Sequence, residues 1–419
     1  MLTHVKWQLF QLLERLTAKG EKQAPAQLPD VKPALWIFVS TVGELNAIGP
    51  LIHHLTARLP ALHLVLLTDR KIYRHAYLAQ YPEADVVEIG VDNATAAVLA
   101  AARPPRLFVV AEIPCLPADA PCRLPFGYLW HAHTCGAKLA VVNGWLYGYA
   151  PSCRIDKIER ALLTSSYLRL FDVLCVQTDD IAHQLVAAGA IPNSVHVTGN
   201  IKFDALHPSN PPGRQVQSPV ALASIEKCRR TVVVAGCVTS DDERELVLDA
   251  FLEIQTRRPD ALLVLAPRHP ENQEVMRSIA ASLQARALSY RSHRDSGDQP
   301  VAQQTKVLIL DTIGELRDFY AHASVAHVGR DHNILEPLAF SKPITVLGDW
   351  SKTYPSFPVL QLCIEHQLVA VCDTATDLHT TWLQSLSAGD TQSGAGLISA
   401  QGATERCLRA IESAFGSRA

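Results

Sequence analysis

The feature that most constrains the fold of this chain is the regular alternation of short apolar segments with longer helical patterns. Strands that alternate with helices form parallel sheets with helices on both faces. The sequence therefore predicts an α/β protein with doubly wound, Rossmann-like sheets. Predicted strands cover 34–39, 63–67, 86–89, 107–110, 138–142, 173–176, 195–198, 231–235, 262–266, 306–310, 325–328, 344–347 and 369–372. Predicted helices include 44–59, 179–188, 241–256, 313–321 and 335–340.

A proline-rich stretch divides this pattern into two halves. The segment His-Pro-Ser-Asn-Pro-Pro-Gly-Arg at 207–214 is typical of a connector. The chain has 419 residues, which is too long for one ordinary domain. We predict an N-terminal domain at 1–207, a linker at 208–228 and a C-terminal domain at 229–419, with a cleft between the two domains. Ligands of such sheets bind outside the carboxyl ends of the strands.

Composition limits the compartment and the partners. The hydrophobic content of 48% fits a soluble globular protein, and the net charge of −3 gives no argument for nucleic-acid binding. The ten cysteines are spread along the chain and no secretory signal is visible, so we expect reduced cytosolic thiols. The polar stretch 291–304 predicts a surface loop.

Residues 1–22 predict an amphipathic helix. Trp7, Phe10, Leu13 and Leu16 recur at helical spacing, but charged residues interrupt the apolar run and exclude a transmembrane span. Such a helix either packs on its own domain or a partner, or lies on a membrane surface. We therefore expect a cytoplasmic protein, recovered mostly in the soluble fraction, with at most a peripheral contact to the inner membrane.

Polar residues gather where the predicted strands end. In the first half, Ser-Thr-Val-Gly-Glu at 40–44 turns a strand into a helix, so Glu44 is either a general base or a first-turn glutamate stabilised by the helix dipole. At the end of this half, Val-Thr-Gly-Asn-Ile-Lys-Phe-Asp at 197–204 places Lys202 beside the connector.

Three turns of the second half carry similar clusters. Pro-Arg-His-Pro at 267–270 offers Arg268 to a phosphate, and Gly314 lies in the turn Asp-Thr-Ile-Gly-Glu-Leu at 311–316. In Gly-Arg-Asp-His-Asn-Ile-Leu-Glu-Pro at 329–337, His332, Asn333 and Glu336 could hold a phosphate and a ribose. Ordinary helix capping by Asp331 or Asn333 is the alternative.

Together, these motifs resemble those of the Kdo (3-deoxy-D-manno-octulosonic acid) transferases of bacterial lipopolysaccharide synthesis, from about residue 35 to the C-terminus. The resemblance implies the GT-B fold and an inverting, metal-independent transfer from CMP-Kdo, without a cofactor, to a glycan or glycolipid. It implies that Glu44 is the catalytic base, that Arg268 contacts the CMP phosphate and that Gly314 lies near the cytosine. His332, Asn333 and Glu336 then hold the donor, and Ser40, Glu112, Asn143 and Lys202 lie on the acceptor side or in the cleft.

The sequence departs from the family pattern in both halves. Gly-Cys-Val-Thr-Ser-Asp at 236–241 lacks the usual Ser-Thr-His run, and Arg330 stands where glycines are usual. On the acceptor side, Glu-Thr-Glu-Leu-Trp-Pro becomes Val-Ala-Glu-Ile-Pro-Cys at 110–115, which keeps Glu112, and the Asn-Ala-Arg turn becomes Asn-Gly-Trp at 143–145. A better-kept donor half predicts a paralogue with a changed acceptor.

Three alternatives stay open. The chain could use another nucleotide sugar, act as a sugar-nucleotide epimerase of the same fold, or bind a ligand without catalysis. A further cluster, Cys115, Cys122, His131, His133 and Cys135, has zinc-ligand residue types. Its spacing matches no standard zinc module, and buried cysteine is often just a small apolar residue. We predict no metal site.

Overall fold

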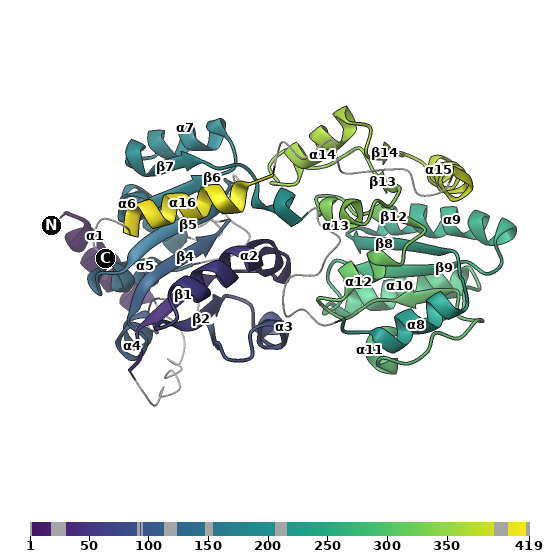
Figure 1. Cartoon of the computed structure of the whole chain (residues 1–419), viewed down its shortest axis with the longest axis horizontal. Coiled ribbons are helices and arrows are strands. Elements are labelled where there is room, and N and C mark those ends of the chain that lie inside the picture. Colours follow the sequence, from purple (N-terminus) through teal and green to yellow (C-terminus); the bar gives the residue numbers. More distant parts are fainter. Residues whose placement is uncertain are drawn as a thin grey trace. The chain divides into compact units, whose positions relative to one another are not determined.

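The computed structural model describes residues 2–17, 31–89, 93, 95–112, 124–146, 154–205, 216–388 and 401–415. Contacts divide the chain into two units (Figure 1). Unit 1 comprises Met1–Asp204 and Ala400–Ala419, and unit 2 comprises Ala205–Ser399. Each unit has one parallel seven-stranded sheet, which confirms the predicted α/β class. The placement of the two units about a cleft stays a prediction.

The sheet of unit 1 has the order β3-β2-β1-β4-β5-β6-β7. Its strands are β1 Ala34–Phe38, β2 His63–Thr68, β3 Asp85–Glu88, β4 Pro105–Ala111, β5 Lys138–Gly144, β6 Val173–Val176 and β7 Val195–Val197. Its helices are α1 Leu2–Thr17, α2 Val42–Arg58, α3 Arg74–Gln80, α4 Ala96–Ala102, α5 Phe126–Thr134, α6 Arg154–Leu170, α7 Asp179–Ala187 and α16 Ala403–Phe415, with 3-10 turns η1 Lys71–Tyr73, η2 Pro192–Ser194 and η3 Ile201–Ala205.

The chain order reverses between β1 and β4, so α2 and α16 pack in one layer, and α1, α4, α5 and α6 in another (Figure 1). Central strands β1 and β4 are almost wholly buried, as expected for a sheet covered on both faces. The edge between β1 and β4 is the switch point at which such sheets bind ligands.

The sheet of unit 2 has the order β10-β11-β9-β8-β12-β13-β14. Its strands are β8 Val232–Val238, β9 Leu262–Pro267, β10 Tyr290–Ser292, β11 Val307–Ile309, β12 Val325–Val328, β13 Ile344–Val346 and β14 Ala370–Val371. Its helices are α8 Pro219–Lys227, α9 Asp241–Arg257, α10 Gln273–Ala285, α11 His293–Ser296, α12 Leu316–Ala321, α13 Leu335–Ala339, α14 Phe357–Glu365 and α15 Ala375–Ala388. Its core lies around α9, Trp382 and the central strands.

The C-terminal helix corrects the predicted domain limits. The prediction of 229–419 as one domain is wrong for α16, which packs on α2, β5 and β6 of unit 1. The Asp204 carboxylate accepts hydrogen bonds from the backbone N–H groups of Gly402 at 2.5 Å and Thr404 at 2.6 Å, and so caps this helix. Arg406 Nε donates to the Thr198 carbonyl at 2.8 Å. Residues of the 197–204 motif therefore hold α16 against unit 1 by hydrogen bonds.

Two further predictions need correction. Part of the linker predicted at 208–228 is helix α8 of unit 2, which buries Ala221, Leu222 and Ile225. The predicted surface loop 291–304 contains the end of edge strand β10 and helix α11. An edge strand of three residues with polar side chains carries no apolar run, so the sequence pattern does not reveal it.

Candidate active site

The predicted residues of unit 1 come together at the carboxyl edge of its sheet. Ser40 follows β1, Glu112 follows β4, Asn143 lies at the end of β5, and Lys202 lies in η3. Glu44, in the first turn of α2, reaches the same place. All but Lys202 are less than 9% exposed. Five polar side chains from five segments therefore lie close together in one mostly buried cluster.

Glu44 both closes a turn and carries an unusual carboxyl group. The Thr41 hydroxyl accepts from the Glu44 N–H at 3.1 Å, and Glu44 Oε2 accepts from the Ser40 N–H at 2.7 Å. Burial raises the pKa of Glu44 to about 8, and the charge of Glu112 adds to this effect. The Ser40 N–H and the charge of Lys202 oppose it. A carboxylate of this pKa is a strong base for its residue type.

Glu112 is held by a cation and an amide. Lys202 Nζ forms an ion pair with Glu112 Oε1, and Asn143 Nδ2 donates to the same oxygen at 3.2 Å. Glu112 and Asn143 have positive φ values of 61° and 57°, which aim both side chains out of the regular strand direction. Asn143 Oδ1 accepts from the Ile201 N–H at 2.9 Å, so β5 also fixes the η3 turn that carries Lys202.

These contacts give two neighbouring carboxyl groups different environments. Glu112 is paired with a cation and an amide, whereas Glu44 has a negative neighbour and little solvent, which raise its pKa. Carboxyl pairs with opposed environments are typical of acid–base sites. Asp69, which the sequence analysis missed, lies beside them and accepts from the Ser40 hydroxyl at 2.9 Å. Its position directly after β2 is the signal that could have revealed it.

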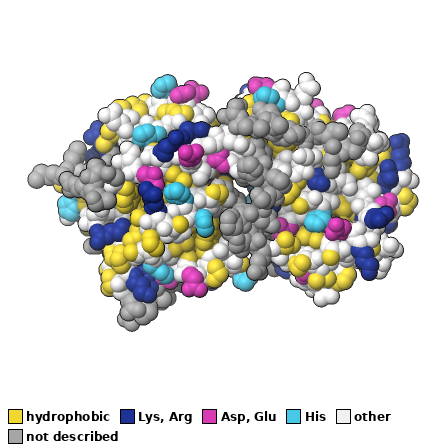
Figure 2. Space-filling model, in the orientation of Figure 1, with side chains coloured by type: hydrophobic (Ala, Val, Ile, Leu, Met, Phe, Trp, Pro, Cys, Tyr) yellow, Lys and Arg dark blue, Asp and Glu magenta, His cyan; other side chains and the backbone are white. Residues whose placement is uncertain are grey.

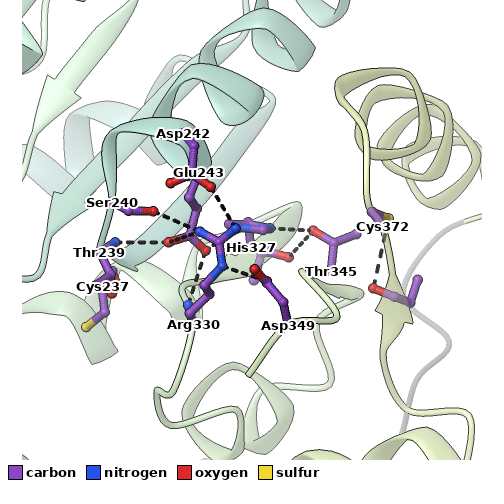
Figure 3. Close-up of polar contacts among 12 residues, drawn as sticks. Cys237, Thr239, Ser240, Asp242, Glu243, His327, Arg330, Thr345, Asp349 and Cys372 are labelled. Carbon is purple, nitrogen blue, oxygen red and sulfur yellow. Dashed lines mark hydrogen bonds and ion pairs between the residues drawn. The ribbon is translucent and has the colours of Figure 1, made fainter. Parts of the chain in front are cut away.

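Unit 2 repeats the turn of Glu44 without repeating its chemistry. Glu243 is also the third residue of a helix that follows the first strand of its sheet, and its Oε2 accepts from the Thr239 N–H at 3.0 Å. Figure 3 shows that Glu243 also faces His327 and Arg330. The Arg330 N–H donates to Glu243 Oε1 at 3.1 Å, and His327 Nε2 lies 3.5 Å from that oxygen. Glu243 is thus a wholly buried carboxylate between two basic groups.

Arg330 is engaged by its own loops. Its guanidinium donates to Asp349 at 2.6 Å, Ser240 at 2.8 Å and Asp242 at 2.9 Å (Figure 3). This cation therefore clamps the turn after β12 to the first turn of α9, rather than pointing to a ligand. A Cβ at Gly329 would collide with the Cys237 carbonyl, so glycine is required where these two turns meet.

Arg268 lies at the neighbouring strand end, after β9. Its N–H donates to the Val238 carbonyl at 3.0 Å, and its guanidinium lies 5.5 Å from the centre of the Tyr354 ring. Burial raises the pKa of the Cys237 thiol to about 12, with a contribution from Glu336, whereas the charge of Arg268 opposes the shift. Arg268 and Glu336 therefore both act on Cys237. Cys237 and Tyr354 were not predicted from the sequence.

The other predicted donor residues have different surroundings. Gly314 has a φ of 96° and lies in the turn after β11, with the Gln217 side chain nearby. Asn333 Oδ1 accepts from the Leu335 N–H at 3.1 Å, but the N-cap residue of α13 is Ile334, so the alternative of Asp331 or Asn333 as N-cap is wrong. Asp331 instead accepts from the Ser351 N–H at 2.7 Å. His332 lies half-buried in the same turn.

The cysteine–histidine cluster is only partly described. Cys115 and Cys122 lie outside the described residues. His131, His133 and Cys135 lie at the end of α5, with His133 and Cys135 exposed. Among residues that the structure describes, no three His, Cys, Asp or Glu side chains gather as metal ligands.

Comparison with known proteins shows what part of this chain is similar to. The family model of 3-deoxy-D-manno-octulosonic-acid transferase (kdotransferase) matches residues 11–205. Curated Kdo transferases of Haemophilus influenzae and Bordetella pertussis are 28% and 33% identical over 211 and 184 residues. These alignments cover 49% and 42% of this chain. Residues 11–205 of this chain are therefore similar to the Kdo transferases.

Coverage limits what the relatives say about this chain. The chain spans less than half the length of these two curated relatives, 46% and 40%. The residues matched by the family model contain Glu44, Glu112, Asn143 and Lys202, and thus the whole cluster of unit 1. A crystal structure of UDP-N-acetylglucosamine 2-epimerase aligns with a TM-score of 0.57 at 15% identity, over 92% of this chain and 98% of the epimerase. This likeness confirms the GT-B fold class and says nothing about the reaction.

Proposed function

We propose that this chain is an inverting glycosyltransferase of the Kdo transferase family. It moves Kdo, or a related ulosonic acid, from a CMP-activated donor to a glycan or glycolipid acceptor. The observation that carries this proposal is the buried Glu44 carboxyl group beside the Lys202-paired Glu112 at the carboxyl edge of β1 and β4. Similarity to the Kdo transferases supplies the substrate class, because neither carboxyl group identifies a sugar.

Glu44 acts as the general base in this proposal. The acceptor hydroxyl gives its proton to the Glu44 carboxylate while its oxygen bonds to the anomeric carbon of the donor sugar. The bond between that carbon and the CMP phosphate oxygen breaks with its electron pair, and CMP leaves from the opposite face. Attack and departure on opposite faces invert the anomeric configuration. Lys202 holds Glu112 by an ion pair, and the charge of Glu112 raises the pKa of Glu44 and makes it a stronger base.

Unit 2 holds the donor. The leaving phosphate gains negative charge, and Arg268 supplies a cation for it without a metal ion. Tyr354 stacks under the Arg268 guanidinium and limits its freedom. His332, Asn333 and Glu336 lie in the turn after β12, where Glu336 accepts hydrogen bonds from the ribose hydroxyls. Arg330 stays with its own carboxylates, so we do not assign it to the donor.

CMP should stabilise the protein against heat more than UMP or GMP does, because a ligand that binds only the folded state raises the melting temperature. The measurement is a set of melting curves at equal nucleotide concentrations. Arg268→Met should remove most of the CMP shift, whereas Arg230→Met, at the amino ends of the same strands, should not. Equal shifts for all three nucleotides would contradict a CMP donor.

Helix α1 supports a peripheral place on the cytoplasmic face of the inner membrane. One side of it packs on its own unit, where Trp7 is 2% exposed and lies 5.2 Å from the Phe126 ring. The other side exposes Val5, Leu9 and Leu12 by 56%, 47% and 55%. Among the described residues, no helix has the length and hydropathy of a membrane span. Surface association therefore remains the proposal.

Vesicles with anionic lipids should carry the protein upward in a flotation gradient. Changing Val5, Leu9 and Leu12 together to Gln should abolish this flotation, because the apolar area that enters the interface is lost. The matched control changes three other exposed apolar residues of unit 1, Val186, Ile191 and Val197, which are 37%, 47% and 44% exposed. Equal flotation of both triple variants would remove the role of α1.

A further inference from the structure

A buried polar cluster outside the proposed contacts joins three distant segments of unit 2. Ser218 immediately precedes α8, His293 begins α11 and Glu315 immediately precedes α12. The Ser218 hydroxyl lies 2.9 Å from His293 Nε2 and donates to Glu315 Oε2, and His293 Nε2 lies 3.0 Å from the same carboxylate oxygen. All three residues are less than 9% exposed.

The geometry of the cluster excludes a nucleophilic triad. In such a triad the carboxylate binds the imidazole nitrogen that does not face the serine. Here Glu315 contacts the same nitrogen as Ser218, and His293 Nδ1 is buried without a hydrogen-bond partner among the described residues. Nε2–H and the Ser218 hydroxyl can both donate to an ionised Glu315. The cluster therefore holds Glu315, which accepts both hydrogen bonds, in a fixed position.

Glu315 belongs to the turn that contains Gly314. The other end of this turn is held by the same short segment: Asp311 accepts from the Ser292 hydroxyl at 2.7 Å and from the Arg294 N–H at 2.9 Å. Residues 292–294 thus grip the turn 311–315 at both ends.

Burial and hydrogen bonding make the attachment of Glu315 to His293 and Ser218 strong. Burial opposes ionisation of Glu315, but hydrogen bonds from His293 and Ser218 outweigh it and lower the pKa of the carboxyl group. Removing one partner of a buried charged group leaves it unsatisfied, which costs more than the bond itself contributes. Loss of the His293 donor should therefore displace the turn.

This turn stands next to the phosphate-binding strand end. Gly314 follows β11 and Arg268 follows β9, and these strands pair directly. Neighbouring strands lie about 4.8 Å apart, so a nucleotide with its phosphate at Arg268 can reach the turn with its base. Gly314 has a φ of 96° and no side chain of its own, so a base that reaches the turn meets its backbone. Fixed N–H and C=O groups can distinguish an amino from a keto edge.

We propose that His293, with Ser218 and Glu315, is a positioning residue that sets base selectivity by fixing the Gly314 turn. The inference rests on the proposed CMP donor. His293 touches no substrate and acts only through Glu315 on the backbone of the turn.

The test compares CMP and UMP affinity by calorimetry in the full chain. His293→Leu should lower the ratio of the UMP Kd to the CMP Kd on the order of tenfold. His293→Gln should keep most of the ratio, because its amide can still donate to Glu315. Ser218→Ala, which removes one donor and little volume, should give a smaller loss. Arg230→Met should leave the ratio unchanged, because Arg230 binds the carbonyls of Ala261 and Thr305 at the opposite edge of the sheet.

The possible results separate a failure of the positioning role from a failure of the proposed CMP donor. A CMP preference that survives His293→Leu, or equal weakening of both nucleotides, overturns the positioning role alone. If His293→Leu does not fold, Ser218→Ala with an unchanged ratio has the same force. A wild-type protein that does not prefer CMP overturns the proposed donor and this inference together.

Discussion

Glu44→Gln should lower the rate of sugar transfer by a factor on the order of 10² to 10⁴. The glutamine side chain keeps the size of glutamate, and its Oε1 can still accept from the Ser40 N–H, but it cannot take the acceptor proton. CMP affinity should barely change, because the donor residues lie in unit 2. The measurement is transfer from CMP-Kdo to an acceptor, or slow hydrolysis of CMP-Kdo until an acceptor is known. Turnover within a few-fold of wild type would remove Glu44 as the base.

The pH dependence separates the base from a merely structural glutamate. A general base works when ionised, so kcat/KM of the wild type should rise with pH and level off above about 8, the pKa of Glu44. Glu44→Gln should lose this rise. Because the folded-state pKa is raised above 4.5, the stability contributed by Glu44 is present below pH 4.5 and is lost as pH rises through 8. The variant should therefore be more stable than wild type at pH 9.

Glu243→Gln is the matched control. Glu243 closes the equivalent turn of unit 2 with the same backbone hydrogen bond, but it lies between His327 and Arg330. Its replacement should lower stability, because Arg330 and His327 lose a buried anionic partner. The rise of kcat/KM with pH should persist. If both variants lose the rise, it reports the integrity of the turn and not a titrating base.

Lys202→Met should destabilise unit 1 by about 3–5 kcal/mol, the cost of leaving a buried carboxylate unpaired. Glu112, with a side chain 4% exposed, would then lose its cation and keep the hydrogen bond from Asn143. The loss should appear in urea unfolding, with hydrogen exchange used to assign it to unit 1. Turnover should also fall, because Glu112 would lose the ion pair that holds it beside Glu44.

A second substitution tests this explanation. Lys202→Met combined with Glu112→Gln removes both charges and should recover most of the lost stability. Lys138→Met is the exposed counterpart: Lys138 is 44% exposed and pairs with Asp172 at 2.7 Å, so its loss should cost less than about 1 kcal/mol. If Lys202→Met and Lys138→Met cost the same, the pair in the cluster behaves as a surface ion pair and the argument fails.

The sequence predicts the strands of both sheets well, because buried parallel strands such as β1 and β8 are continuous apolar runs between helices. It predicts which residues stand at strand ends, and so identifies Glu44, Glu112 and Lys202. It does not predict that Lys202 pairs with Glu112, because that contact depends on the positive φ values of Glu112 and Asn143. Glu44 is the proposed base, whereas Arg330 is bound by its own loops. In both cases the partners of the charged side chain, and not its residue type, decide whether it can act on a ligand.

Amphipathic helices explain the main error in domain limits. The apolar face of α16 predicts that the helix packs on a sheet but does not say which sheet. The Asp204 cap and the Arg406 contact help to hold it on unit 1. The anchoring role of 292–294 was likewise hidden, because polar residues that bind each other look like a solvated loop in the sequence.

The return of α16 has a consequence for how the chain is made. Unit 2 is translated between the two pieces of unit 1, so β6 must wait for its covering helix until all of unit 2 has emerged from the ribosome. Unit 2, in contrast, is continuous in the sequence and can complete its sheet first. Unit 2 should therefore reach its final structure before unit 1, which carries Glu44, although its synthesis begins later.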